Sequence, residues 1–365
     1  MTAPPATKFH RIDLPFPMRR GGTLDGVQIA YETWGELAPD LSNAVLLFTG
    51  LSPSAHAASS TADRSPGWWE EMLGAGKPID TDRYFVICVN SLGSCFGSSG
   101  PASPIPGTNE SYRLSFPVLS IEDIAQGGHE VVRALGIEKL FATVGSSMGG
   151  MTALVFNLLY PGASRGLISI SAAARATPFA IAMRSLQREI IRSDAAWADG
   201  TYEIGKGPIL GMRLARKLGM ITYRSAVEWK DRFGRVRITD DRFTDEPFAM
   251  RFEIESYLDA HARKFTGQFD PNCVLYLSRS MDLFDIADHG SDVADALGKV
   301  SGDRMLIVGV HSDILFPVEQ QRELAEGLKR PGRALEFIEL PSVQGHDSFL
   351  VDHERFGPIV AAFFK

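Results

Sequence analysis

Cysteine is scarce in this 365-residue chain, and long apolar runs are missing. The three cysteines, Cys88, Cys95 and Cys273, have neither a metal-ligand spacing nor the even number of a disulfide framework. We therefore interpret them as reduced thiols of a cytoplasmic protein and expect no metal site. The main apolar runs, such as 44–48 and 84–89, are far below the roughly 18 residues of a membrane-spanning helix, so no membrane partner is expected.

Basic residues are also too few for a nucleic-acid-binding protein. The chain has 37 lysines and arginines against 44 acidic residues, which gives a net charge of −7. Nucleic acid usually needs a basic footprint, so we do not expect it as a partner. The first residues lack the charged start and apolar core of a secretory signal. Apolar residues make up 44% and charged residues 22%, which is ordinary for a globular protein.

From about Gly22 onward, short apolar runs alternate with helical patterns. Runs of this kind are typical of parallel-sheet strands that are buried on both faces. The helical patterns cover 121–135 and 151–160, whereas we expect the Pro-rich first 20 residues to be irregular. The predicted strands are Ala44–Phe48, 84–89, 140–144, 167–170, 305–310 and Ala334–Leu340.

Helical patterns dominate between about residues 174 and 298, and strand runs return only after them. The simplest interpretation is a sheet that is interrupted by a helical insertion and then resumed. We therefore predict an α/β fold with a mostly parallel central sheet and helices on both faces. Its core domain comprises residues 1–173 and 299–365, and residues 174–298 form a helical lid domain.

The most informative segment is 140–160, which contains a strand, a Gly-rich turn and a helix. Gly145, Ser147 and Gly149 form the pattern G-x-S-x-G in the strand-to-helix context of a nucleophile elbow. The nucleophile of such an elbow sits on a sharp, strained turn, so its neighbours must be small, and the helix N-terminus stabilises an anion. The alternative is a Gly-rich turn that serves only packing. The flanking strand and helix favour Ser147 as a nucleophile.

A serine nucleophile needs a base, and the base needs an acid that orients it. On this fold the acid and then the histidine follow the serine along the chain. Of the eight histidines, His346 fits best because it lies in a loop after the last predicted strand. Asp313 follows the strand 305–310, where the acid is expected. The alternatives are a solvated loop histidine and a turn or N-cap aspartate.

The oxyanion of the reaction needs two backbone N–H donors. One is expected from Met148, which follows the nucleophile, and the other from near Leu51 in the loop after 44–48. Asp347 is adjacent to His346, which makes it difficult for this carboxylate to orient the ring. We therefore interpret Asp347 as a substrate contact.

Several short stretches along the chain have a family-specific character. They are 30–34 (AYETW), 55–57 (AHA), 67–69 (GWW), 79–82 (IDTD), 90–100 (NSLGSCFGSSG), 145–151 (GSSMGGM), 221–224 (ITYR), 255–258 (ESYL), 313–317 (DILFP) and 345–350 (GHDSFL). In these stretches the chain resembles the homoserine acyltransferase family of α/β-hydrolase-fold enzymes, over nearly its whole length. Members of this family transfer an acyl group from a coenzyme A thioester to an amino-acid hydroxyl. The resemblance implies an α/β-hydrolase fold, a triad of Ser147, Asp313 and His346, and oxyanion donors at Leu51 and Met148.

The resemblance also implies how the substrates are held. Arg216 would bind the carboxylate of the acceptor amino acid, and Asp347 would bind its ammonium group, as their charges allow. A surface ion pair is the alternative for both residues. The acyl-CoA would be a substrate, with no permanently bound cofactor, and the family's insertion forms a dimer contact, so we expect a homodimer.

Two departures from the homoserine enzymes resemble the serine O-succinyltransferase branch. Most homoserine acyltransferases have Leu-Thr-Gly in the oxyanion loop, whereas here Leu51 is followed by Ser52, Pro53 and Ser54. Pro53 would stiffen this loop and fit serine, which is one methylene smaller than homoserine. Arg184 replaces an amide residue of many members and would bind the free carboxylate of a succinyl group. The alternative for Arg184 is a solvated helix arginine.

Positive charge is concentrated in the insertion, although the chain as a whole is acidic. Between Lys206 and Arg237 there are nine basic residues and two acidic ones. Such a cluster would attract coenzyme A phosphates and an acyl carboxylate. Solvated helix faces explain the same pattern equally well.

Together these features predict a ping-pong transfer of an acyl group, with succinyl-CoA favoured as donor, to the hydroxyl of L-serine in cysteine biosynthesis. Two alternatives stay open. One is a homoserine O-acetyltransferase or O-succinyltransferase of methionine biosynthesis. The other is an esterase or thioesterase, which uses the same triad but admits water to the acyl-enzyme.

Overall fold

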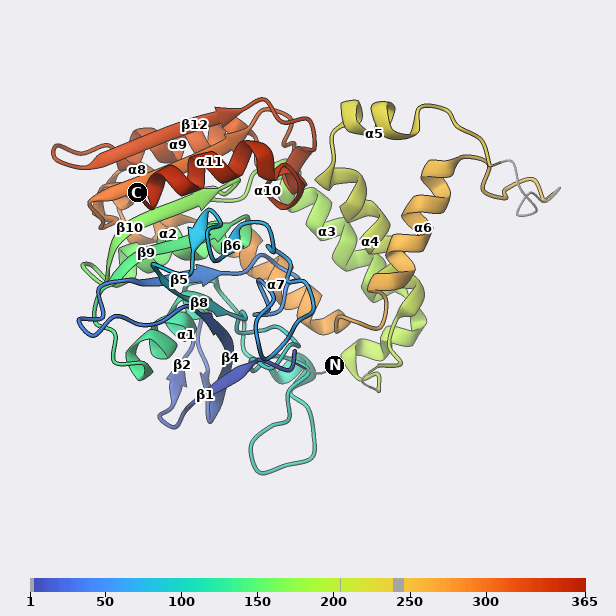
Figure 1. The fold of residues 1–365 in the computed structure, drawn as a ribbon. Coiled ribbons are helices and arrows are strands. Elements are labelled where there is room, and N and C mark those ends of the chain that lie inside the picture. The colour runs from blue at the N-terminus through green and yellow to red at the C-terminus, as the bar shows by residue number, and fades with distance from the viewer. Residues whose placement is uncertain (1–2, 204, 239–245) are drawn as a thin grey trace.

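The computed structural model describes residues 3–203, 205–238 and 246–365. An eight-stranded sheet lies at its centre, in the order β1-β4-β8-β5-β9-β10-β11-β12 (Figure 1). Strand β4 is antiparallel to both of its neighbours, and the strands from β8 to β12 run parallel. The prediction of a mostly parallel sheet is confirmed. The strands of this sheet are β1 (Lys8–Ile12), β4 (Val27–Trp34), β5 (Ala44–Phe48), β8 (Phe85–Val89), β9 (Leu140–Ser146), β10 (Ser164–Ile170), β11 (Arg304–Val310) and β12 (Ala334–Leu340).

The strands predicted from apolar runs are all present, and β5 and β12 match the predicted ranges at both ends. The prediction that the first 20 residues are irregular is wrong, because they contain β1 and β2 (Phe16–Pro17), which pairs with β3 (Thr23–Leu24). β1 is an edge strand, and only one of its five residues is buried. Such a strand has no apolar run by which it could be recognised.

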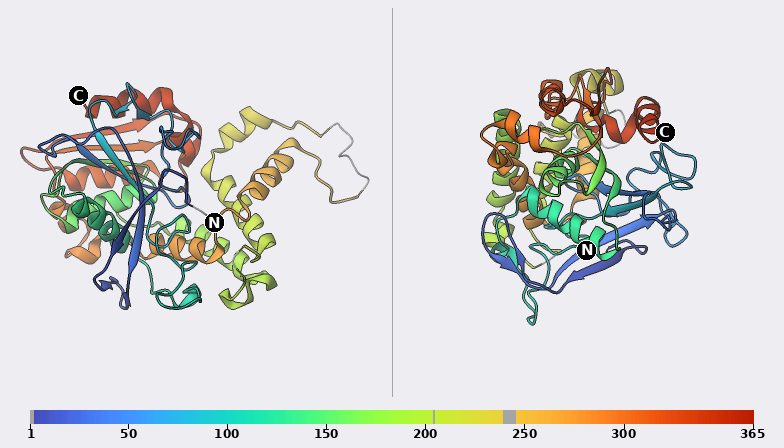
Figure 2. Two further views of the ribbon diagram at one scale, coloured as in Figure 1. Left: turned by 60° about the horizontal axis from the view of Figure 1, so that its bottom comes forward. Right: turned by 90° about the vertical axis from the view of Figure 1, so that its left-hand side faces the viewer.

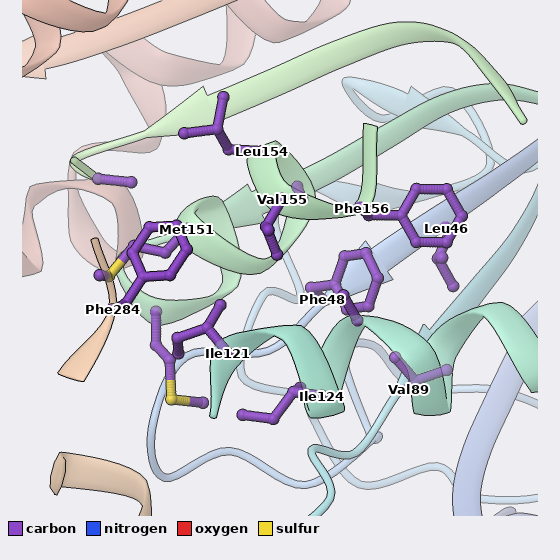
Figure 3. Packing of buried hydrophobic residues seen from close by; sticks show 14 of the residues in the cluster. Leu46, Phe48, Val89, Ile121, Ile124, Met151, Leu154, Val155, Phe156 and Phe284 are labelled. Atoms are coloured by element: carbon purple, nitrogen blue, oxygen red, sulfur yellow. The ribbon is translucent and has the colours of Figure 1, made fainter. Parts of the chain in front are cut away.

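Helices cover both faces of the sheet, and alternate residues of β5 show where each core lies. Leu46 and Phe48 belong to a cluster with helices α1 (Ile121–Ala134) and α2 (Met148–Leu159), as Figure 3 shows. Val45 and Leu47 belong to a second cluster with helix α11 (His353–Phe363). Because side chains alternate across a strand, the two clusters lie on opposite faces. Helix α9 (Val318–Leu328) also packs in the first cluster, and the short β6 (Leu73–Gly74) and β7 (Ile79–Asp80) pair beside the second.

The insertion between β10 and β11 is helical, as expected from its sequence. Figures 1 and 2 show α3, α4, α5 and α6 standing apart from the helices that cover the sheet. The remaining helices of the insertion contribute Cys273, Leu277 and Leu297 to the first core cluster, so its last part packs as core rather than as lid. The helices are α3 (Pro178–Ser193), α4 (Ile209–Tyr223), α5 (Ala226–Phe233), α6 (Glu253–Phe265), α7 (Pro271–Leu283) and α8 (Val293–Lys299).

Among the residues that the structure describes, none of the helices is both long enough and apolar enough to cross a bilayer. Loops that follow four of the parallel strands, at their carboxyl ends, reach one region under the lid. They come after β5, β9, β11 and β12, and the last of them leads into a short helix, α10 (Ser348–Val351). In an open α/β sheet this end is where a site is expected.

Candidate active site

Ser147 lies at the turn between β9 and α2, with a φ of 54° and a ψ of −126°. A positive φ is strained for any residue other than glycine. The turn leaves no room for larger neighbours: a Cβ on Gly145 would lie 2.0 Å from the Gly149 carbonyl oxygen, and one on Gly149 would lie 2.3 Å from the Phe48 carbonyl oxygen. The sequence pattern therefore forms the geometry of a nucleophile elbow, with Ser147 at its tip.

The structure brings Ser147, His346 and Asp313 together from three distant parts of the chain. His346 Nε2 lies 2.8 Å from Ser147 Oγ, and His346 Nδ1 lies 2.7 Å from Asp313 Oδ2. The second oxygen of Asp313 accepts hydrogen bonds from the backbone N–H groups of Leu315 and Phe316, both at 2.9 Å. All three side chains are buried. This is the arrangement of a Ser-His-Asp triad, in which the carboxylate fixes the ring and the ring faces the hydroxyl.

The electrostatics of the site favour protonation of His346. Burial by itself lowers the pKa of this imidazole, but the adjacent Asp313 carboxylate outweighs burial, and the net pKa is raised above the ordinary value of 6.5. Asp347 adds to the increase, whereas the charge of Arg184 acts against it. A raised pKa makes the neutral ring a stronger base toward a serine hydroxyl. Arg184 lines the same cavity as Ser147 and His346.

A cavity of about 200 Å³ opens at Ser147, between the core loops and the lid. On the core side its wall includes Leu51, Ser52 and Pro53 of the loop after β5. Opposite these loops the wall is largely apolar and comes from the lid helices α3, α4 and α6 and from α7, which packs with the core, with Ile191, Met212, Ala215, Phe265, Val274 and Met281. The lid helices therefore cover the serine on the side away from the sheet.

The two predicted oxyanion donors come from different parts of the chain: Met148 directly follows Ser147, and Leu51 lies in the loop after β5. Met148 is the first residue of α2 and is fully buried. The first N–H groups of a helix have no partner within that helix, so the Met148 amide is available to an anion at the elbow. Leu51 lines the cavity, and the loop that carries it is tied down by Asn90, whose Nδ2 donates to the Pro53 carbonyl at 3.2 Å.

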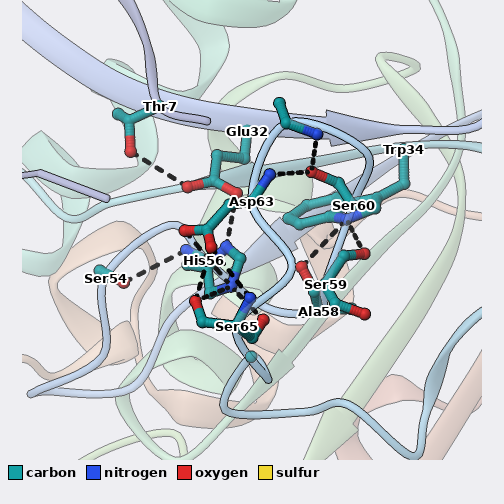
Figure 4. Close-up of polar contacts among 12 residues, drawn as sticks. Thr7, Glu32, Trp34, Ser54, His56, Ala58, Ser59, Ser60, Asp63 and Ser65 are labelled. Atoms are coloured by element: carbon teal, nitrogen blue, oxygen red, sulfur yellow. Dashed lines mark hydrogen bonds and ion pairs between the residues drawn. The ribbon is translucent and has the colours of Figure 1, made fainter. Parts of the chain in front are cut away.

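Ser54 is not among the described residues that line the cavity, and its side chain bonds within its own loop. Its Oγ accepts from the His56 backbone N–H at 3.2 Å. The His56 ring is buried, with Nδ1 2.9 Å from Glu32 Oε2 and Nε2 2.9 Å from the Ser65 carbonyl oxygen (Figure 4). Burial lowers the pKa of His56, but the hydrogen bonds to Glu32 and Ser65 and the charges of the Glu32 and Asp63 carboxylates together outweigh burial, so the net pKa is raised. A buried polar network therefore anchors the oxyanion loop to β4.

Arg216 and Asp347 both line the cavity beside the triad. The Arg216 guanidinium carbon lies 4.4 Å from the ring centroid of Phe265, and its buried Nε has no hydrogen-bond partner in the described part of the chain. Asp347 Oδ2 accepts from Nε of Arg224 at 3.0 Å. Burial raises the pKa of Asp347, and the charges of Arg224, His346 and Arg216 offset part of this increase. A cation and a carboxylate thus face the same space.

Arg184 is 6% exposed and lines the cavity from α3, so it is not a solvated helix arginine. Its Nε donates to Asp282 Oδ1 at 2.6 Å, and Arg188 Nη2 forms an ion pair with Asp282 Oδ2 at 2.6 Å. Nη2 of Arg184 is buried and has no partner among the described residues. Two guanidinium groups therefore share one carboxylate, which leaves one positive charge in excess at the cavity wall.

Sequence reasoning missed several residues of this site. Phe316 stacks on the His346 ring, with 5.0 Å between the ring centroids, and Asp282 holds Arg184. Phe316 lies inside the stretch 313–317, which carries the family resemblance, but nothing in the sequence shows that it packs on His346. Asp282 gave no signal beyond its residue type, because its partner Arg184 is distant in sequence. Arg224 was inside one of the stretches that carry the family resemblance, but nothing in the sequence shows that it pairs with Asp347.

The other residue types that often form functional sites are metal-ligating side chains and thiols. Within the parts of the chain that are described, no three histidine, cysteine or carboxylate side chains are grouped so as to hold a metal ion. Cys88, Cys95 and Cys273 are free thiols.

Comparisons with known proteins place this geometry in a family. The model of the α/β hydrolase fold matches residues 43–352. A serine O-succinyltransferase of Stenotrophomonas maltophilia (strain K279a) is 58% identical over 361 residues, which cover 99% of this chain and 98% of that protein. The homoserine O-acetyltransferase from Bacillus anthracis has a TM-score of 0.89 at 27% identity and covers 98% of this chain and 97% of its own.

An esterase has nearly the same fold. Esterase E22 has a TM-score of 0.88 at 25% identity, and the match covers 98% of this chain and 99% of that one. The fold class and the family resemblance predicted from the sequence are both confirmed. The chain therefore belongs to the α/β-hydrolase fold family, on the branch of the serine O-succinyltransferases.

Proposed function

We propose that this protein transfers a succinyl group from succinyl-CoA to the hydroxyl of L-serine, in the synthesis of cysteine. The observation that carries the proposal is the contact of Ser147, His346 and Asp313 at the bottom of a cavity whose wall holds the excess positive charge of Arg184. The 58% identity with a serine O-succinyltransferase over nearly the whole chain supports it.

The first half of the reaction acylates Ser147. His346 takes the hydroxyl proton through Nε2 while Oγ attacks the thioester carbonyl. The negative charge on the carbonyl oxygen is stabilised by the amides of Leu51 and Met148, and loss of one such donor typically costs about 2.7–4 kcal/mol of activation free energy. The C–S bond then breaks, and coenzyme A leaves with the proton from His346. A succinyl ester of Ser147 is left.

The second half transfers the acyl group. L-serine enters with its carboxylate toward Arg216 and its ammonium group toward Asp347. His346 removes the proton from its hydroxyl, and the oxygen attacks the ester carbonyl. When the bond to Ser147 Oγ breaks, His346 returns the proton to Ser147, and O-succinylserine is released.

Arg184 accounts for the acyl donor in this proposal. A buried guanidinium with an unpaired Nη2 is costly unless an anion binds to it. Succinyl has a free carboxylate that meets this requirement, and acetyl has none. The basic residues between 206 and 237 would attract the phosphates of coenzyme A, although several of them, such as Lys217 with Asp259, already have acidic partners.

The acceptor is the finer part of the proposal. Ser52 and Pro53 line the cavity, and Ser54 accepts a hydrogen bond within the same loop. A methylene group is worth only about 1–3 kcal/mol of discrimination in a pocket, so the shape of this loop must separate serine from homoserine.

A crossed matrix of two acceptors and two acyl-CoAs, with release of coenzyme A as readout, tests the donor and the acceptor together. We expect the highest kcat/KM for succinyl-CoA with L-serine. A preference for L-homoserine would instead support a homoserine O-acyltransferase of methionine synthesis. The structural likeness to an esterase keeps hydrolysis as a second candidate, and continuous release of coenzyme A without an acceptor would favour it.

We also propose that the protein is a cytoplasmic homodimer that contacts its second copy through the lid. Helix α4 supports this because Leu210, Leu214 and Ile221 are large apolar side chains that are exposed at helical spacing. The free thiols support a reducing compartment. Sedimentation analysis of the wild type and of Leu214→Glu would test the dimer, because the charge should dissociate it.

A further inference from the structure

The link between α4 and α5 lies directly against the loop that carries His346 (Figure 1). Ser225 Oγ donates to the Val343 carbonyl oxygen. Gly345 has a φ of 67°, and a Cβ there would lie 2.7 Å from the Tyr223 carbonyl oxygen. The backbone of the lid therefore packs on the residue that precedes the proposed catalytic histidine.

Arg224 sits in this link between two carboxylates. Its Nε donates to Asp347 Oδ2 at 3.0 Å, and its Nη1 donates to Glu228 Oε1 at 2.8 Å. Glu228 is itself fixed at the start of α5, where its backbone N–H donates to Ser225 Oγ at 3.1 Å. The guanidinium is thus held on both sides, and it binds Asp347 through one oxygen only.

We propose that Arg224 is a positioning residue for the acceptor amino acid: from the lid it holds Asp347 through Oδ2, so that Oδ1 faces the cavity and receives the acceptor's ammonium group. This inference rests on the proposed function, in which Asp347 binds the acceptor. It goes further by assigning a role to a residue that touches neither substrate. It also makes docking of the lid a condition of the second half-reaction.

The electrostatics of Asp347 give the physical reason. Burial raises the pKa of this carboxyl, and Arg224 is the largest of the charges that oppose the increase, ahead of His346 and Arg216. Without Arg224, the carboxyl would be both less often charged and free to rotate. A neutral or rotated carboxyl binds an ammonium group poorly. The acylation step uses Ser147, His346 and the acyl-CoA, and it does not need this contact.

The two half-reactions can be measured separately, which distinguishes positioning from general support of the fold. The variant Arg224→Gln should release one coenzyme A per chain from succinyl-CoA at a rate within about twofold of the wild type. Its kcat/KM for L-serine should fall at least about tenfold, as expected for loss of a charge-assisted contact. Arg224→Lys keeps the charge but loses the two-sided fork, so its kcat/KM for L-serine should lie between the two.

Arg232→Gln is the matched control. Arg232 lies on α5 and forms a longer ion pair with Glu228 at 3.9 Å, but its side chain is 44% exposed. Among the described residues, the ion-pair partner of Asp347 is Arg224 and not Arg232. Its removal takes the same charge from the same region, and both half-reactions should stay within about twofold of the wild type. If Arg224→Gln does not fold, Arg224→Lys against this control carries the test.

Three outcomes overturn the inference. An unchanged kcat/KM for L-serine in Arg224→Gln shows that Asp347 does not need the arginine. An equal loss in acylation and transfer, or an equal loss in the control, shows a structural role only. A wild type that succinyl-CoA does not acylate overturns the proposed function and this inference together, whereas an acylated wild type with unaffected variants overturns the inference alone.

Discussion

The two walls of the cavity are built differently. On the core wall, Ser147, His346 and Asp313 follow strands of one sheet, and each is fixed by backbone geometry or hydrogen bonds. On the lid wall, the charged groups are arginines of the helical insertion, such as Arg184 and Arg216. The core wall therefore supplies a reaction that many acyl groups could undergo, and the lid wall supplies charges that suit particular substrates. Substitutions on the core wall should therefore lower activity with every substrate, whereas substitutions on the lid wall should have smaller effects that depend on the substrate.

The largest effect is expected on the core wall. In the proposed mechanism Ser147→Ala removes the atom that carries the acyl group, so transfer should fall by at least about 10⁴-fold with every acyl-CoA and acceptor. Steady-state release of coenzyme A from succinyl-CoA and from acetyl-CoA measures this. A variant that loses activity with only one donor would show that the serine is not the common nucleophile.

On the lid wall the effect should depend on the substrate. Arg184→Gln removes the excess positive charge, and kcat/KM for succinyl-CoA should fall by roughly 10–100-fold, since hydrogen bonds to charged groups are worth about 1.5–3 kcal/mol. Activity with acetyl-CoA, which has no carboxylate, should stay the same or increase. The ratio of the two kcat/KM values is the measurement. An equal loss for both donors would show that Arg184 does not select the acyl donor, so the proposed difference between the two walls would be wrong.

Asp282 holds the arginine that is proposed to select the acyl donor, and it should also contribute to the stability of the fold. Its side chain is 1% exposed and is shared by Arg184 and Arg188. Asp282→Asn leaves the buried guanidinium of Arg184 and the partly buried one of Arg188 without their counter-ion, so the free energy of unfolding should fall by roughly 3 kcal/mol. Urea titration measures this, and Glu326→Gln, which removes an exposed ion pair with Lys329, should leave the midpoint nearly unchanged. If the urea midpoints of the two variants were similar, the arginines would not need the Asp282 carboxylate as their counter-ion, and the prediction would be contradicted.

The smallest effect is a shift in pH dependence, and it belongs to the core wall. In the proposed mechanism neutral His346 is the base. The kcat/KM for succinyl-CoA should therefore be lost as the pH falls through the pKa of this ring, which Asp313 raises above 6.5. The acid limb of the profile should therefore lie above pH 6.5 in the wild type. Asp313→Asn removes the raising charge, so its limb should move to lower pH as its rate falls. A limb that moves to higher pH would contradict the role of Asp313.

Much of the core wall could be predicted from the sequence because its signals are local. The apolar runs of β5, β9 and β11 marked the strands, and the order of Ser147, Asp313 and His346 along the chain follows from which loops end at the same edge of a sheet. The edge strand β1 was missed because its exposed residues do not form an apolar run.

The lid wall could be predicted only in part, since its charges act through distant partners. Arg184 and Arg216 were identified through the family resemblance, but the contacts that hold them were not. Asp282 is 98 residues from Arg184 in sequence, and Asp347 is 123 residues from Arg224. No periodicity or motif connects residues at such distances, so these pairs required the structure.

The most direct test of the account is to identify where the acyl group sits between the two half-reactions. The enzyme is mixed with succinyl-CoA without an acceptor, quenched, digested and analysed by mass spectrometry. We predict one succinyl group per chain, on the peptide that contains Ser147, and its loss when L-serine is added before the quench. An unmodified Ser147 peptide, or a succinyl group elsewhere that serine does not remove, would contradict the account.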